Sequence, residues 1–153
     1  MKSSTDRIEK RIELNASPAR VWRALTDYRE FSAWFGVNLR GPFVAGEKTR
    51  GNITYRGYEH LVMEVDVAAM EEPTRFAFRW HPYAVDVNVD YSNEPPTLVE
   101  FRLQPAGGGT LLVVTESGFD AIPEHRRAEA FRMNDGGWTQ QIVNIQKHVE
   151  TNR

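Results

Sequence analysis

The fold is decided by the stretch Ser17-Pro18-Ala19-Arg20-Val21-Trp22-Arg23-Ala24-Leu25-Thr26-Asp27. Ser17 is a strong helix N-cap, and Pro18 is tolerated in the first helical turn, where its missing N–H is not needed. The apolar residues that follow recur at helical spacing. Thr26 or Asp27 can cap a second short helix, which the glycine at position 36 ends. That helix would carry Tyr28, Phe31, Trp34 and Phe35.

The segments on both sides of these helices alternate in polarity instead of repeating at helical spacing. A polar-rich run with Ile8, Ile12 and Leu14 predicts a strand before them. Alternating runs over 61–67, 76–80, 99–103 and 110–116 predict strands after them, with turns at 71–73 and 106–109. Strands that are joined by turns form an antiparallel sheet. The connection 81–96 is long, and the alternation of its valines, Val85, Val87 and Val89, is compatible with a further strand.

The strand over 61–67 has a strict period of two, which sets its orientation. Met63 and Val65 should face the core together with Leu61 and Val67, while Glu64 and Asp66 should face solvent. A shift of one residue would bury both carboxylates, so the register is strongly specified.

The C-terminal segment, about Pro123 to Val149, has helical spacing. We expect its apolar stripe to lie across the concave face of the sheet, with the polar residues Gln140, Gln141, Asn144 and Lys147 mostly elsewhere. Gly136-Gly137 disfavours a helix by about 1 kcal/mol per glycine, which suggests a kink, a close helix–sheet approach or a flexible lid. The stripe consists of Trp138, Ile142, Ile145 and Val149.

These elements predict an α+β architecture formed by residues 1–153 as one domain. A curved antiparallel sheet wraps on a long C-terminal helix, and two short helices follow the first strand. A helix lying on a concave sheet encloses a space, and the contents of that space decide the function.

Composition narrows the classes of function. The 153 residues are 41% hydrophobic and 26% charged, with a formal net charge of −2, as in an ordinary globular domain. A net charge of this sign and size does not favour electrostatic binding to nucleic acid or acidic membranes. The absence of Cys excludes disulfides, thiolate zinc sites and a Cys nucleophile.

With no signal-peptide run and no membrane span, we expect a cytoplasmic protein that is a monomer or a homodimer.

The order of elements, with particular residues, resembles the START-like superfamily, also called SRPBCC or helix-grip. Within it the chain looks like the family named for activators of the ATPase of the heat-shock protein Hsp90, in its small bacterial form. The resemblance is carried by the 17–27 stretch, Trp34-Phe35, Thr115-Glu116-Ser117-Gly118-Phe119 and Gly137-Trp138. Phe35-Gly36-Val37-Asn38 departs from the family's usual Pro-Gly or Trp-Trp-Gly-Pro, and 40–57 matches poorly. The superfamily includes lipid carriers, cyclases, ligand receptors and co-chaperone domains, so the resemblance implies a fold rather than a function.

The fold places a set of apolar residues where they would line a ligand cavity, although a filled core would use the same residues. Apolar ligands need apolar walls and a few polar groups that fix orientation. The expected ligand-binding residues are Met63, Phe76, Phe78, Trp80, Phe101, Leu112, Val114, Glu116, Trp138 and Ile142.

Two polar residues are candidates for chemistry in this cavity. Glu116 shares the inward face of its strand with Leu112 and Val114, so it would either orient a ligand or act as a base. The alternative is a rim position paired with an arginine. His81 follows a strand end and could reach the cavity mouth, although an exposed loop position is the plainer expectation. The aspartates of the same loop, Asp86 and Asp90, are expected to be solvated.

The sequence therefore favours binding of a small hydrophobic molecule, with no cofactor, no metal and no assigned catalytic residue. No His-x-x-x-His pair and no serine triad pattern is present. One alternative is a polyketide-cyclase-like enzyme that uses Glu116, His81 or Tyr83. The other is a chaperone-accessory protein-interaction domain. A cavity lined by apolar groups would favour binding, and a filled core with an exposed apolar patch would favour protein interaction.

Overall fold

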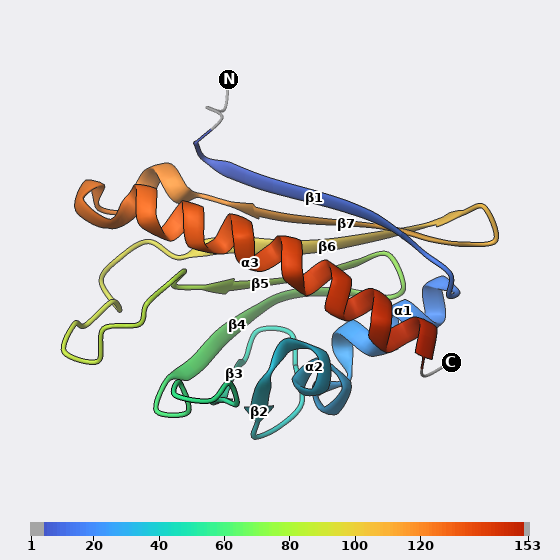
Figure 1. Ribbon diagram of the computed structural model, residues 1–153, viewed down its shortest axis with the longest axis horizontal. Coiled ribbons are helices and arrows are strands. Elements are labelled where there is room, and N and C mark those ends of the chain that lie inside the picture. Colours follow the sequence, from blue (N-terminus) through green and yellow to red (C-terminus); the bar gives the residue numbers. More distant parts are fainter. Residues whose placement is uncertain (1–4, 152–153) are drawn as a thin grey trace.

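The computed structural model describes residues 5–151, which form a seven-stranded antiparallel sheet with one long helix across its concave face (Figure 1). The strand order is β1-β7-β6-β5-β4-β3-β2. The strands are β1 (Arg7–Leu14), β2 (Val37–Leu39), β3 (Lys48–Ile53), β4 (Val62–Glu71), β5 (Arg75–Trp80), β6 (Thr97–Ala106) and β7 (Gly109–Ser117). The helices are α1 (Pro18–Thr26), α2 (Tyr28–Phe35), the short 3-10 turn η1 (Phe119–Ala121) and α3 (Glu124–Thr151). The α+β helix-grip prediction is confirmed.

Helices α1 and α2 form where the capping residues place them. Ser17 Oγ accepts a hydrogen bond from Arg20 N at 3.2 Å, and Asp27 Oδ1 accepts one from Arg29 N at 2.9 Å. Gly36 ends α2 with φ of +91°, a left-handed conformation that favours glycine. The two helices connect one edge strand, β1, to the opposite edge strand, β2. They lie near the C-terminal end of α3 (Figure 1).

From β2 to β7 the chain is a meander, in which each strand pairs with the next. The β6–β7 hairpin turns at Gly107 and Gly108, both with positive φ, as a two-residue primed turn requires. In β4 the side chains of Met63, Val65 and Val67 are buried and those of Glu64 and Asp66 are exposed, so the predicted orientation is confirmed. Leu61 lies just before the strand and is half-buried.

Helix α3 packs its apolar stripe against the sheet and α2. Trp138, Ile145 and Val149 are buried, as predicted, whereas Ile142 is only half-buried. Gln141 is also buried, contrary to the expectation that it lies off the stripe. Its side chain donates a hydrogen bond from Nε2 to the carbonyl oxygen of Phe35 at 3.0 Å, which satisfies the amide inside the protein. The stripe is therefore wider than its apolar residues alone indicate.

The glycine pair of α3 does not mark a close approach to the sheet. The helix is continuous through Gly136 and Gly137, and a Cβ at either position would meet no surrounding atom within 4 Å. The expectation of tight contact there is wrong, because the missing side chains leave open space. No helix within residues 5–151 has the length and apolar character needed to cross a membrane.

The connection 81–96 contains turns and no strand. Its valines are exposed, with Val87 at 70%, so their alternation reflects no sheet pairing. The further strand that the alternation of these valines allowed is therefore not formed. The connection lies beside the N-terminal half of α3, where Figure 1 shows it as the long yellow-green loop.

Candidate ligand-binding cleft

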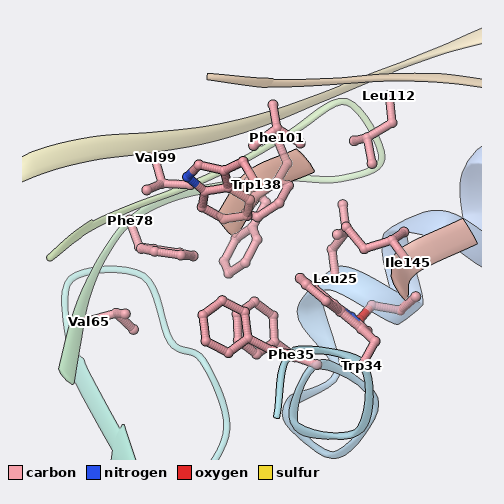
Figure 2. Packing of buried hydrophobic residues seen from close by; sticks show 14 of the residues in the cluster. Leu25, Trp34, Phe35, Val65, Phe78, Val99, Phe101, Leu112, Trp138 and Ile145 are labelled. Atoms are coloured by element: carbon pink, nitrogen blue, oxygen red, sulfur yellow. The ribbon is translucent and has the colours of Figure 1, made fainter. Parts of the chain in front are cut away.

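The centre of the sheet face is filled with aromatic rings. Phe76 stacks on Phe101 with ring centroids 5.8 Å apart, and Phe78 contacts Phe101 at 6.0 Å. Figure 2 shows side chains from the sheet, α1, α2 and α3 pointing toward one another in this cluster. Phe76, Phe78 and Phe101 are fully buried, as is Leu112. The three phenylalanines that the sequence assigns to a cavity therefore form part of a packed core.

A cleft of about 460 Å³ opens at one end of this core. Its volume lies within the range of small-molecule sites. Phe35 of α2 and Trp80 of β5 form its inner wall, the connection 81–96 forms its outer wall, and the start of β4 forms its side. It is lined by Phe35, Ile53, Leu61, Val62, Met63, Glu64, Trp80, His81, Tyr83, Ala84, Val85, Tyr91, Ser92 and Asn134.

A smaller inner pocket of about 110 Å³ adjoins the cleft beneath α3. Three residues line both spaces: Phe35, Trp80 and Asn134. Gly137 and Trp138 complete the inner pocket together with Gln141. Gly137 has no side chain that could fill this space. The glycine disfavours the helix, but it leaves an opening beside the cleft.

Behind the inner pocket, Glu116 is buried among neutral hydrogen-bond donors. Trp138 Nε1 donates to Oε1 at 2.8 Å, and Trp80 Nε1 donates to Oε2 at 2.8 Å. Thr97 Oγ1 donates to Oε2 at 2.6 Å, and Asn134 Nδ2 donates to both oxygens at 2.9 and 3.2 Å. Glu116 itself is 0% exposed and lines neither of the two spaces. Neutral donors therefore surround the Glu116 carboxylate in place of the arginine partner that the sequence left open.

The Glu116 network fixes the walls of both spaces. An indole N–H only donates, so each tryptophan is held in one orientation by the carboxylate oxygen that it reaches. Trp80 and Trp138 lie 5.9 Å apart with their rings tilted by 31°. Thr97 of β6, Glu116 of β7 and Asn134 of α3 are thereby joined across three elements. A buried polar network whose members are satisfied makes its surroundings rigid.

The outer wall is fastened to α3 by Arg126. Its guanidinium donates to Glu94 through Nε and Nη2, the shortest distance being 2.6 Å, and Nη1 donates to the carbonyl oxygen of Pro82 at 2.9 Å. The same group lies over the ring of Tyr91, 4.8 Å from its centroid. Both charged side chains are largely buried, so this bidentate pair is a strong one. The connection 81–96 is thus a braced wall of the cleft.

His81 lies in the cleft wall with its Nε2 3.0 Å from the carbonyl oxygen of Glu94. The side chain of His81 is half-buried, whereas the sequence led us to expect an exposed loop position. Asp86 and Asp90 are exposed and accept hydrogen bonds from backbone N–H groups two residues further on, as turn residues do. Over residues 5–151, no three His, Asp or Glu side chains gather closely enough to hold a metal ion.

A second charged cluster holds the far end of α3. Glu30 of α2 contacts Arg20 and Arg23 of α1 and His148 of α3, at 2.8, 3.0 and 2.9 Å. Burial opposes ionisation of Glu30, but the hydrogen bonds from His148 and Arg20, with the charge of Arg20, hold its pKa below the ordinary 4.5. This cluster joins all three helices and lies away from the cleft.

The structure brings together only part of the predicted residue set. Met63 and Trp80 line the cleft, and Trp80 and Trp138 line the inner pocket. Glu116 lies directly behind them. The other predicted residues line neither space, and they are Phe76, Phe78, Phe101, Leu112, Val114 and Ile142.

Sequence reasoning missed Phe35, Asn134 and most of the connection 81–96, of which it considered only His81 and Tyr83 as possible groups of the site. Asn134 precedes Trp138 by one helical turn, so extending the stripe of α3 toward its N-terminus would have found it. Phe35 was assigned to the second helix without a place in the site. The connection has no periodic pattern, so nothing in its sequence indicates that it forms a wall.

Residues 15–150 match the sequence family described as Activator of Hsp90 ATPase homolog 1-like protein. The chain belongs to this family. The match covers the capped helices, Glu116 and Trp138, so the resemblance carried by those motifs is confirmed. Among curated proteins, none matches this chain.

Solved structures share the helix-grip fold of this chain. A protein from Mesorhizobium loti has a TM-score of 0.75 at 22% identity, covering 96% of this chain and 98% of its own. The Aha1 dimer from Colwellia psychrerythraea has a TM-score of 0.69 at 18% identity, covering 94% and 96%. A protein of the dynemicin biosynthetic locus has a TM-score of 0.73 at 24% identity over 97% of this chain, which spans only 48% of that protein. These identities establish the fold alone.

Proposed function

We propose that this chain acts as one domain that binds a small, largely apolar molecule in the cleft between β4, the connection 81–96 and α3. The observation that carries the proposal is an aromatic wall, Phe35 and Trp80, that faces a braced loop across a cleft of about 460 Å³. Such a site needs no cofactor. The cleft lies at one end of the core, so the ligand site is smaller than the cavity expected from the sequence.

The cyclase-like alternative has weaker support. A general base must reach the proton that it removes. Glu116 lies behind the inner pocket, and its oxygens already accept five hydrogen bonds. A catalytic role would fall to His81 or Tyr83, which line the cleft but belong to no evident acid–base pair. Binding without chemistry is therefore the better-supported function.

The protein-interaction alternative rests on the apolar side chains exposed near the cleft mouth. Val62 and Val85 line the cleft and are also exposed, and Val87 follows on the same connection. The cleft, by contrast, offers a concave site with aromatic walls. A ligand that enters the cleft would cover part of Val62 and Val85.

The proposal is tested with N-phenyl-1-naphthylamine, an uncharged dye that fluoresces in apolar surroundings. We expect one site with micromolar affinity, which corresponds to about −8 kcal/mol. Ala84→Trp fills the cleft and should weaken binding at least about tenfold. Ala68→Trp places the same group at an exposed position of β4 outside the cleft and should leave affinity unchanged. A titration of the folded protein that stays flat to the solubility limit of the dye would overturn the proposal.

A further inference from the structure

Asn134 is the polar residue at the junction of the cleft and the inner pocket. It lines both spaces, and its carboxamide lies between them and the Glu116 carboxylate. Its amide nitrogen Nδ2 donates to Oε1 of Glu116 at 2.9 Å and to Oε2 at 3.2 Å. The neighbouring Trp80 and Trp138 donate to the same carboxylate from either side.

Glu116 determines which way this carboxamide faces. An Asn side chain has a donor end and an acceptor end of nearly equal shape, and its orientation follows from its hydrogen bonds. The reversed orientation would place the acceptor Oδ1 against both carboxylate oxygens, where acceptors repel each other. The donor end therefore faces Glu116, and Oδ1 faces away from it.

The outward-facing oxygen has no partner within the described part of the chain. Asn134 Oδ1 accepts no hydrogen bond there, and it is not among the buried atoms that lack one, so solvent or a ligand can reach it. Around it lie the aromatic rings of Phe35 and Trp80 and the open space beside Gly137, and the amide of Gln141, which also lines the inner pocket, is already hydrogen-bonded to the carbonyl oxygen of Phe35. An accessible acceptor among aromatic rings is the kind of group that orients a ligand.

The remaining polar groups of the cleft do not offer a binding site for an anion. Glu64 and His81 are the ionisable acid and base among its lining residues, apart from the tyrosine hydroxyls. Arg126, the cation braced behind the wall, donates to Glu94 and to backbone carbonyls. The hydroxyls of Tyr83, Tyr91 and Ser92 can both donate and accept, so they do not select between ligand types.

We propose that Asn134 Oδ1, held outward by Glu116, selects uncharged apolar ligands that carry a hydrogen-bond donor, such as a hydroxyl group, over matching ethers and carboxylates. This inference rests on the proposed binding function and names the ligand class of the same cleft. A donor satisfies Oδ1 at the end of the aromatic wall. An ether or a carboxylate brings an acceptor against an acceptor, with the charge of Glu116 behind it.

The test compares 2-naphthol, 2-methoxynaphthalene and 2-naphthoate by calorimetric titration at neutral pH, where the naphthol is uncharged. We expect the native protein to bind 2-naphthol about tenfold more tightly than the ether, and the carboxylate more weakly than either. Equal affinities for naphthol and ether, or tighter binding of naphthoate, would overturn the inference while leaving the binding function intact. Failure of all three probes to bind would instead count against the binding function itself.

Asn134→Leu removes the acceptor, together with the Nδ2 donor to Glu116, and keeps the approximate size of the side chain. We expect this variant to bind naphthol and ether equally, whereas the control Ala68→Trp retains the preference of the native protein. A folded Asn134→Leu variant that keeps the tenfold preference would show that another group anchors the ligand. Because the three-probe comparison uses the native protein alone, the inference is tested even if this variant fails to fold.

Discussion

At the residue scale, the stability of this fold depends on how the Glu116 carboxylate is satisfied. Two indoles, a hydroxyl and an amide supply the donors, and all of these are neutral. Glu116→Gln replaces one acceptor oxygen by an NH₂ group, which then faces donors. Since a buried donor without a partner costs about 1–3 kcal/mol, we expect the free energy of unfolding to fall by about 2–4 kcal/mol. Urea denaturation measures this change.

The control for this substitution is Glu9→Gln on β1. Glu9 is paired with Arg7 at 2.8 Å on the solvent-exposed face of the sheet, where solvent can replace the lost contact. We expect a loss of about 1 kcal/mol or less. Equal losses for the two variants would mean that the Glu116 network contributes no more than a surface ion pair.

Trp138 combines packing and hydrogen bonding in one side chain. It is 3% exposed and lies edge-on to Phe101 at 5.7 Å, although one side of it borders the inner pocket. We expect Trp138→Ala to lower the free energy of unfolding by about 3–5 kcal/mol. Trp138→Phe keeps an aromatic ring, so it should lower the free energy of unfolding clearly less than Trp138→Ala does. A Trp138→Ala variant with unchanged stability would contradict the packing seen here, and guanidinium denaturation of both variants tests it.

At the element scale, the connection 81–96 behaves as a wall because α3 holds it. Arg126→Met removes the cation and leaves Glu94 nearly buried without its partner. We expect a loss of about 1–3 kcal/mol in global stability. Amide hydrogen exchange across 83–95 should rise at least about tenfold, because this segment has no strand pairing of its own.

The matched control is Arg132→Met, also on α3. Arg132 is exposed and lies 3.8 Å from Glu129, a surface contact of small value. Exchange in 83–95 should remain that of the native protein in this variant. Native-like exchange in Arg126→Met as well would show that the connection is held by other contacts.

At the scale of the whole molecule, the fold could be predicted because its determinants are local. Ser17 and Asp27 cap their helices through their own side chains, and the alternation of β4 assigns each residue to one face. Glycines at positions 107 and 108 supply the turn that joins β6 to β7. Each of these signals acts over a few residues, so the sequence displays it directly.

The candidate site was less predictable because it depends on contacts between distant segments. Whether Phe78 lines a cavity or fills a core is decided by how closely Phe31 and Phe101 approach it, which no alternation pattern encodes. The wall formed by 81–96 depends on Arg126, more than thirty positions away from Glu94. Asn134 is polar, so a search for an apolar stripe passes over it although it lies on that stripe.

The cluster around Glu30 makes the assembly of the three helices depend on pH. Because the pKa of Glu30 is lowered in the folded protein from the ordinary 4.5, its contribution is complete above that value and is lost as pH falls through the folded pKa. Glu30→Gln should therefore lower the free energy of unfolding by about 1–2 kcal/mol at neutral pH, with a difference that shrinks below about pH 4.5. Urea denaturation between about pH 3 and pH 7 measures both curves. Glu72→Gln, at an exposed turn residue, is the control and should follow the native curve. If Glu30→Gln instead ran parallel to the native curve over this range, the ionised Glu30 would not be what holds α1, α2 and α3 together.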